Sequence, residues 1–274
     1  MSCFACPACG ERLKRLEKAY VCPNGHSYDI ASEGYVYLLP PNKKHSKAPG
    51  DDRQMVASRR RFLEAGFYRI FSDALNELAL CSLPEPLSFA VDAGCGEGYY
   101  TGRLAAFLSA HGESTSLCGF DISKAAVRLA AKHYRNIPFA VGSMFGIPVP
   151  DASADLLTDV FAPIVPGEFA RVVKPGGAMI LAVPGERHLY GLKEILYDAP
   201  YENERRDTEY PGFRFAERVP VRGNLATEDP QTMRDLFAMT PYYWKTPREG
   251  SERLAAARHL ETELAFDFLL YRRE

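Results

Sequence analysis

Short apolar runs alternate with helical patterns through the middle of the chain. The apolar runs that predict β-strands cover residues 88–92, 117–121, 138–141, 155–161 and 178–183. Helices are predicted between them at 99–110 and 123–134, the second with Ser123 as its N-cap. Strands and helices that alternate over loops this short predict an α/β fold, with a parallel sheet covered by helices on both faces.

The pattern before this region is helical and follows a basic linker. Residues 42–50 are polar, basic and interrupted by proline and glycine, which is typical of a linker. From Asp51 onward, apolar residues recur at helical spacing, with Asp51 and Asp52 at the positions of an N-cap and a first-turn acid. Gly66 predicts a break in this pattern, so we expect two helices.

The N-terminal segment is too short to build an adequate apolar core, and it is rich in cysteine. Cys6 and Cys9 form a C-x-x-C pair, and Cys22 and His26 follow after twelve intervening residues. Three thiolates and one imidazole at this spacing predict a zinc site, and four protein ligands make it structural. Cys3 forms a second C-x-x-C pair with Cys6, so a site that uses Cys3 and Cys6 stays open.

Composition places the chain among folded globular proteins, and its charge is unevenly distributed. Of its 274 residues 46% are hydrophobic and 25% charged, and no apolar run is long enough to span a membrane. The first residues lack the pattern of a secretory signal, so we expect a cytoplasmic protein. The net charge is −2, but residues 1–69 carry 12 Lys and Arg against 7 Asp and Glu.

This basic N-terminal quarter of the chain favours a polyanionic partner, and an ordinary solvated surface is the alternative. The candidate phosphate contacts are Lys43, Lys44, Lys47, Arg59, Arg60 and Arg61.

A glycine-rich turn follows the first predicted strand and indicates the cofactor. It reads D-x-G-x-G-x-G from Asp92 to Gly98, and neither register completes the G-x-G-x-x-G pattern of dinucleotide folds. A carboxylate before the glycines suits a ligand without phosphate, such as S-adenosylmethionine, and Asp121 ends the next strand, where a carboxylate can accept ribose hydroxyls. A purely structural turn is the alternative. The candidate cofactor residues are Asp92, Gly94, Gly96, Glu97, Gly98, Asp121, Ile122, Ser143 and Met144.

Beyond these features, the chain resembles bacterial 23S ribosomal RNA guanine-N1 methyltransferases over nearly its whole length. The matching stretches are C-P-x-C with C-P-x-G-H, E-G-Y-V-Y-L-L-P (33–40), P-G-D (49–51), R-R-x-F-L-x-x-G-x-Y (59–68), D-x-G-C-G-E-G-Y-Y-T (92–101), A-R-V-V-K-P-G-G (170–177), P-G-x-R-H-L (184–189) and M-T-P-Y-Y-W (239–244). The resemblance implies a Rossmann-like class I methyltransferase sheet with a small N-terminal zinc-binding domain.

The same resemblance implies an activity, a substrate and two further cofactor residues. It implies methylation of N1 of a guanine in a 23S rRNA stem-loop near the peptide exit tunnel by a homodimer, and it places Tyr68 and His188 beside the cofactor. Two subgroups of the family modify neighbouring guanines, and one is linked to macrolide resistance. The expected division is a zinc-binding RNA-recognition module (1–41), a basic linker with helices (42–84) and the methyltransferase domain (85–274).

The chemistry of guanine N1 points to further candidates. N1 carries a proton that must leave, and Asp159 or His188 is a candidate acceptor. Phe161, Tyr68 or Trp244 is a candidate surface on which the base stacks. Two other functions stay open: a methyltransferase acting on a small molecule, and a non-catalytic RNA-binding adaptor that retains the cofactor fold.

Overall fold

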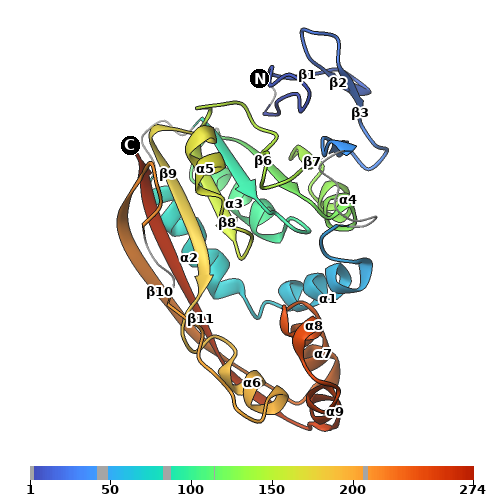
Figure 1. The fold of residues 1–274 in the computed structure, drawn as a ribbon, viewed down its shortest axis with the longest axis vertical. Coiled ribbons are helices and arrows are strands. Elements are labelled where there is room, and N and C mark those ends of the chain that lie inside the picture. The colour runs from blue at the N-terminus through green and yellow to red at the C-terminus, as the bar shows by residue number, and fades with distance from the viewer. Residues whose placement is uncertain (1–2, 42–48, 83–87, 114, 206–208) are drawn as a thin grey trace.

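The computed structural model describes residues 3–41, 49–82, 88–113, 115–205 and 209–274 (Figure 1). They build one eight-stranded sheet and a separate three-stranded sheet near the N-terminus. Three of the predicted RNA contacts, Lys43, Lys44 and Lys47, lie outside the described residues. No helix in the described part of the chain is long and apolar enough to cross a membrane.

The large sheet has the strand order β10-β11-β9-β8-β5-β6-β7-β4. Its strands are β4 (Val36–Tyr37), β5 (Phe89–Ala93), β6 (Ser116–Asp121), β7 (Phe139–Val141), β8 (Ala154–Val160), β9 (Val173–Pro184), β10 (Phe213–Thr227) and β11 (Leu260–Arg273). All neighbours from β9 to β4 run parallel, so the five predicted strands and their parallel arrangement are confirmed. The antiparallel pairs β9–β11 and β11–β10 were not predicted.

The helices follow the predicted positions up to residue 134. They are α1 (Arg53–Glu64), α2 (Arg69–Cys81), α3 (Tyr99–Ala110), α4 (Lys124–His133), α5 (Pro166–Val172), α6 (Tyr190–Leu196), α7 (Pro230–Ala238), α8 (Tyr242–Lys245) and α9 (Arg248–Ala256). The predicted N-cap Ser123 is confirmed, since it accepts a hydrogen bond from the Ala126 N–H. In α1 the N-cap is Asp52, which accepts from the Met55 N–H. Asp51 lies before the helix, so the predicted first-turn acid is wrong. Gly66, with φ +88°, separates α1 from α2.

Two apolar cores lie on opposite faces of the sheet, and β11 contributes to both. Phe266 and Phe268 pack in the core that includes α2 and α3, whereas Leu269 and Tyr271 pack in the core that includes α5. A strand buried on both faces carries a nearly continuous apolar run rather than an alternating one. The predicted covering of the sheet by helices on both faces is therefore confirmed.

The N-terminal residues form a small module that continues into the large sheet. Strands β1 (Lys14–Arg15), β2 (Ala19–Val21) and β3 (Ser27–Asp29) make an antiparallel sheet. The next strand, β4, then pairs in parallel with β7 at the edge of the large sheet, where Val36 is fully buried. The structure thus joins the end of the predicted 1–41 module directly to the methyltransferase sheet.

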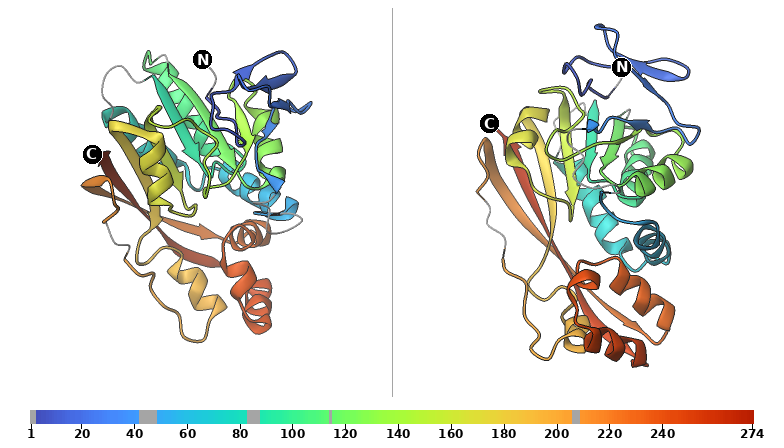
Figure 2. Two further views of the ribbon diagram at one scale, coloured as in Figure 1. Left: turned by 45° about the horizontal axis from the view of Figure 1, so that its top comes forward. Right: turned by 45° about the vertical axis from the view of Figure 1, so that its right-hand side comes forward.

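The C-terminal third extends the molecule away from this module. The long antiparallel strands β10 and β11 extend past the rest of the sheet to α6, α7 and α9. These helices lie at the far end of the molecule from β1–β3 (Figures 1 and 2). Helix α7 packs against α1, so the C-terminal helices return to the carboxyl ends of the parallel strands. That edge of the sheet is where ligands bind in folds of this kind.

Candidate functional site

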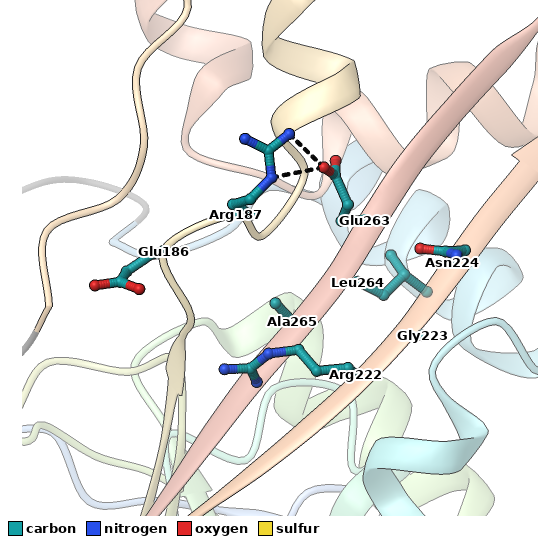
Figure 3. Close-up of a pocket in the computed structure, with 8 residues that line it drawn as sticks. All are labelled: Glu186, Arg187, Arg222, Gly223, Asn224, Glu263, Leu264 and Ala265. Carbon is teal, nitrogen blue, oxygen red and sulfur yellow. Dashed lines mark hydrogen bonds and ion pairs between the residues drawn. The ribbon is translucent and has the colours of Figure 1, made fainter.

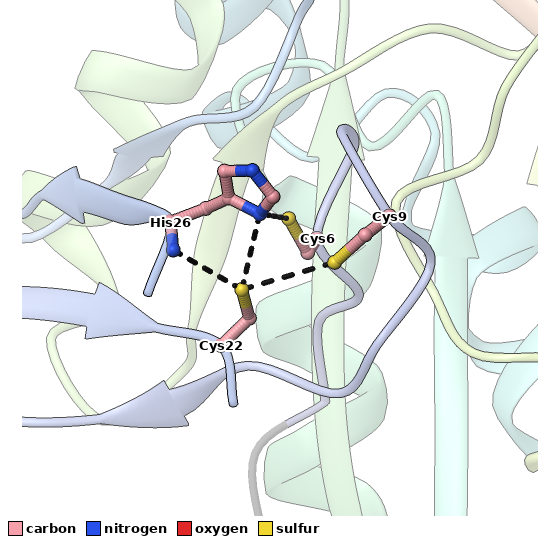
Figure 4. Close-up of side chains that lie close together, drawn as sticks. All are labelled: Cys6, Cys9, Cys22 and His26. Atoms are coloured by element: carbon pink, nitrogen blue, oxygen red, sulfur yellow. Dashed lines mark hydrogen bonds between the residues drawn. The ribbon is translucent and has the colours of Figure 1, made fainter. Parts of the chain in front are cut away.

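Four predicted zinc ligands meet in the N-terminal module (Figure 4). The ligand atoms of Cys6, Cys9, Cys22 and His26 all lie within 4.8 Å of one another. The Nδ1 atom of His26 is 3.3 Å from the Cys22 sulfur and 3.5 Å from the Cys6 sulfur, and the Cys9 and Cys22 sulfurs are 3.8 Å apart. Three soft thiolates and one imidazole suit Zn²⁺, and this closed set of four makes it a structural ion.

Cys3 takes no part in this cluster. It is buried in the core beneath the module, and its thiol hydrogen-bonds with Cys118 of β6, which together with burial raises the pKa of Cys118. Of the two arrangements that the sequence left open, the structure therefore brings together the one built on Cys6 and Cys9. Cys3 instead ties the start of the module to the centre of the large sheet.

The glycine-rich turn lies at the carboxyl end of β5 and has the backbone that its sequence predicts. Gly94, Gly96 and Gly98 all have positive φ angles, of +74°, +55° and +86°. A Cβ on Gly94 would stand 2.4 Å from the Cβ of Ala162, so the turn packs directly against the segment that follows β8. Gly96 is open by contrast, because within the described part of the chain a Cβ there would meet only the Arg59 guanidinium, at 3.8 Å. A ligand can therefore approach the backbone closely at Gly96.

Acidic groups surround this turn. Asp121 accepts hydrogen bonds from the backbone N–H groups of Gly96 (3.0 Å) and Ser123 (2.7 Å), which holds its carboxylate at the end of β6. Asp92 accepts hydrogen bonds from the hydroxyls of Thr101 and Thr158. Its burial outweighs these bonds and raises the pKa of Asp92 to about 6. Open backbone at Gly96 and a fixed carboxylate at Asp121 suit the amino-acid and ribose groups of S-adenosylmethionine, which the residues present therefore fit.

The other predicted cofactor residues are close to the same edge. Glu97 is buried and pairs with Arg60, while Ile122 follows Asp121 directly. Ser143 accepts a hydrogen bond from the Phe145 N–H in the buried turn after β7, next to the buried Met144. Direct contact with the cofactor remains a prediction for every one of the candidate cofactor residues.

The contact between Gly94 and Ala162 gives a testable result. We expect Gly94→Ala to lose at least tenfold in affinity for S-adenosylhomocysteine, because the added methyl group clashes with Ala162 and the left-handed φ angle strains any L-residue. The measurement is calorimetric titration. Gly112→Ala is the matched control, since Gly112 has φ +82° with nothing within 4 Å of an added Cβ. Equal affinities of the two variants would contradict the packing argument.

An aromatic cluster lies next to the turn and contains three predicted site residues. Tyr68 precedes α2, Phe161 follows β8, His188 follows β9, and all three contact Phe266 of β11. The Tyr68 hydroxyl is 3.4 Å from Nε2 of His188. Phe161 is 43% exposed and has a φ angle of +59°, which is uncommon for a bulky residue. The backbone at the end of β8 thus holds an aromatic face open at the site.

The two candidate proton acceptors differ in their surroundings. The Nδ1 atom of His188 accepts the Ala265 N–H at 3.2 Å, which leaves the proton of the neutral ring on Nε2, and burial lowers the pKa of His188 to about 3. Asp159 is also buried, but its Oδ2 has no hydrogen-bond partner among the described residues. Burial raises the pKa of Asp159 to about 8. The environment of Asp159 favours proton uptake, and that of His188 opposes it.

The three consecutive arginines of α1 all pair with acids of this protein. Arg59 pairs with Asp51, Arg60 with the buried Glu97, and Arg61 with the buried Asp235 through two hydrogen bonds. These pairs fasten α1 to the glycine-rich turn and to α7. RNA contacts by these arginines remain predictions, and each would compete with an internal carboxylate.

Trp244 in α8 is 66% exposed and therefore does not anchor a core.

A hollow of about 300 Å³ lies over the paired strands β10 and β11 (Figure 3), where Arg187 and Glu263 pair with each other. Its lining contains none of the predicted cofactor residues, so this hollow is not the predicted cofactor site.

Residues that sequence analysis missed come mainly from the C-terminal third. Phe266 and Ala265 shape the cluster around His188, but the apolar run of β11 carries no motif that indicates a site. The packing of Ala162 against Gly94 has no signal in the sequence, although Ala162 stands beside Phe161. The sequence around Asp51 indicates only an acid at the start of a helix, and nothing in its spacing indicates the pairing with Arg59.

Comparisons with known proteins agree with this geometry. Residues 4–47 match a zinc ribbon described as RlmA, N-terminal, and residues 88–238 match a methyltransferase domain. A protein of Micromonospora griseorubida named as a 23S rRNA (guanine-N1)-methyltransferase is 38% identical over 92% of this chain and 90% of its own length. A Streptomyces fradiae protein named 23S rRNA (guanine(748)-N1)-methyltransferase is 31% identical over 91% of this chain and 89% of its own.

A Bacillus subtilis protein that also bears the name of a 23S rRNA (guanine-N1)-methyltransferase is 29% identical and covers 98% of this chain and 96% of its own. The similarity thus spans the zinc cluster, the glycine-rich turn and the C-terminal helices alike. With a relative 38% identical over nearly its whole length and a matching zinc ribbon and methyltransferase domain, this chain belongs to the 23S rRNA (guanine-N1)-methyltransferase family.

Proposed function

We propose that the protein transfers the methyl group of S-adenosylmethionine to N1 of a guanine in a 23S rRNA stem-loop near the peptide exit tunnel. The observation that carries this proposal is the contact of Gly94 with Ala162, because it sets the cofactor turn against the segment from Asp159 to Phe161. Three relatives named for this reaction on 23S rRNA support the same substrate.

The residues at this junction have distinct tasks in the proposed reaction. When bound, the cofactor supplies a methyl group made electrophilic by a sulfonium. The exposed ring of Phe161 stacks on the extruded guanine and orients N1. The N1 proton passes to Oδ2 of Asp159, which has no partner of its own among the described residues. His188, held by Ala265 and facing Tyr68, keeps the wall of the site rigid and neutral.

The proposed product is directly readable, because a methyl group on N1 blocks the Watson–Crick edge of guanine. Purified protein would be incubated with S-adenosylmethionine and unmodified 23S rRNA, and new reverse-transcription stops would be mapped. One new stop at a guanine in the expected stem-loop supports the proposal and identifies the subgroup. Cofactor binding without any stop would favour a small-molecule acceptor, and a lack of cofactor binding would favour a non-catalytic adaptor.

We also propose how the rest of the molecule serves this reaction. Residues 1–41 recognise the RNA, residues 42–84 form a basic connection, and residues 85–274 carry the chemistry. The protein acts as a homodimer in the cytoplasm, where ribosomes are assembled. Light scattering of the purified protein tests the dimer, since a monomeric mass would contradict it.

The linker lysines test the predicted RNA surface without breaking internal ion pairs. We expect Lys43, Lys44 and Lys47 changed together to Gln to weaken RNA binding and to reduce the slope of log K against log [salt] by up to about 3, because each phosphate contact releases a counterion. The measurement is a salt titration of RNA affinity. The triple variant Lys132, Arg135 and Arg258→Gln, at three exposed positions, provides the control for lost charge alone. An unchanged slope in the linker variant would refute the contact.

Trp244 gives a further test of the RNA surface. It lies beside Lys245 in α8, and an exposed indole next to a cation is a good platform for an unpaired base. We expect Trp244→Ala to weaken RNA binding about tenfold with an unchanged melting temperature, because the side chain is mostly exposed. Trp244→Phe should retain most of the affinity. If the alanine variant binds RNA as the wild type does, Trp244 is no stacking surface.

A further inference from the structure

The guanidinium of Arg59 lies over the middle of the cofactor turn. Among the described residues, its Nη1 is the atom within 4 Å of a Cβ built on Gly96, at 3.8 Å. Nη1 also pairs with Asp51, and Nη2 donates to the Met239 carbonyl at 3.3 Å. Arg59 therefore reaches from α1 across the open backbone at Gly96 to the segment before α8.

The segment that carries Asp51 is fastened to the second cofactor strand. The Ser123 hydroxyl donates to the Asp51 carbonyl at 2.6 Å, and a Cβ on Gly50 would stand 2.8 Å from the Ile122 side chain. Gly50 and Asp51 thus pack on the residues that follow Asp121. Arg59 and Asp51 together form an ion pair that covers the glycine-rich turn between β5 and α3.

Arg59 differs from its two neighbours in how its donors are used. Arg61 is held by two hydrogen bonds to the buried Asp235, and Arg60 lies between the buried Glu97 and Glu64. Arg59 pairs with an acid that is 28% exposed, and the contacts described for it occupy only part of its five N–H groups. Arg59 is also the arginine whose guanidinium lies at the open backbone of Gly96, so it is placed to bind a further anionic partner at the turn.

The charge around the turn explains what that partner is. Asp92, Glu97 and Asp121 make its surroundings acidic, so an anionic group placed there needs a cation. S-Adenosylmethionine has a single anionic group, the carboxylate of its methionine half. We infer that Arg59 is a cofactor-binding residue whose guanidinium holds this carboxylate, rather than the RNA contact that its sequence suggested. The inference rests on the cofactor assignment of the proposed function.

A pair of ligands isolates the carboxylate. S-Adenosylhomocysteine carries it, and the decarboxylated analogue, with an aminopropyl group in place of the amino-acid end, lacks it. Calorimetric titration of both ligands would compare the wild type with Arg59→Gln and with Arg53→Gln, a matched loss of one arginine from the exposed start of α1. A charge-assisted hydrogen bond of ordinary strength predicts that Arg59→Gln binds S-adenosylhomocysteine at least about tenfold more weakly.

The analogue decides how the result is read. We expect Arg59→Gln to bind the decarboxylated analogue within about twofold of the wild type, and Arg53→Gln to bind both ligands normally. Equal losses for both ligands, or no loss for either, would overturn the inference. Arg59→Lys retains the positive charge and replaces Arg59→Gln if that variant fails to fold. We expect Arg59→Lys to lose affinity for S-adenosylhomocysteine by a smaller factor and to bind the decarboxylated analogue normally. Absence of S-adenosylhomocysteine binding by the wild type would instead contradict the cofactor assignment itself.

Discussion

Asp159→Asn should reduce methyl transfer to 23S rRNA by about 10²- to 10⁴-fold while leaving the affinity for S-adenosylhomocysteine close to that of the wild type. An amide has nearly the shape of the carboxyl group and can still accept the Ala162 N–H, which Asp159 now accepts at 2.9 Å. It cannot take up the proton of guanine N1 at Oδ2. Single-turnover rates with saturating cofactor measure the loss.

The pH dependence of the wild type follows from the same buried carboxyl group. Burial raises the pKa of Asp159 to about 8, so its basic form is scarce at pH 6. We expect kcat/KM to rise about tenfold per pH unit toward pH 8 and then to level off. His188→Gln serves as the comparison: it should retain this rising limb, because His188 is neutral throughout the range with a pKa of about 3. If the rise of kcat/KM with pH were lost in His188→Gln but kept in Asp159→Asn, His188 rather than Asp159 would be the proton acceptor.

Stability should change in the opposite sense to activity. A carboxyl group whose pKa is raised in the folded state binds its proton more tightly there than in the unfolded chain. Between about pH 4 and pH 8 the unfolded chain loses that proton first, so the contribution of Asp159 to stability falls as pH rises. Asparagine removes this penalty. We therefore expect the cofactor-free Asp159→Asn variant to melt at least about 2–4 °C above the wild type at pH 8, with a smaller difference near pH 4.

Removal of zinc should unfold the N-terminal module and abolish rRNA methylation while cofactor binding persists. About forty residues cannot bury enough apolar surface to fold alone, and a structural zinc ion contributes roughly 10–16 kcal/mol at neutral pH. We expect one zinc per chain, loss of it with Cys22→Ala, and trypsin cleavage at Lys14, Arg15 or Lys18 once it is lost. Metal analysis and limited proteolysis are the measurements.

Cys3 provides the matched control for this experiment. Cys3→Ala removes a buried thiol from the core beside Cys118, so we expect a modest loss of stability with one zinc still bound. Titration with S-adenosylhomocysteine shows whether the methyltransferase sheet survives in the zinc-free protein. A zinc-free Cys22→Ala protein that resists trypsin would show that the module folds without metal, and zinc lost from Cys3→Ala would return Cys3 to the ligand set.

Local features of the sequence were sufficient for the parallel core and the metal ligands. Asp52 and Ser123 are caps in the structure because each needs only a backbone N–H three residues ahead. The glycines of the turn have positive φ angles, which other residue types adopt only at a cost in free energy. The spacing of the glycines alone therefore predicts the backbone conformation of the turn. The zinc site is similarly readable, since two short pairs separated by a dozen residues predict one coordination sphere. The choice of Cys9 over Cys3 came from the structure.

Tertiary structure alone decided the rest, because it depends on contacts between distant segments. The strand β11 is buried on both faces, so its apolar and polar residues do not alternate. Nothing in the sequence therefore indicates that Phe266 contacts His188 at the site. The pKa of Asp159 is set by burial and that of His188 by burial and nearby cations, neither of which a motif records. The charge of Arg59 suggested a nucleic-acid contact, whereas its position over Gly96 points to the cofactor. Charge is a property of the residue, but the partner of that charge is a property of the fold.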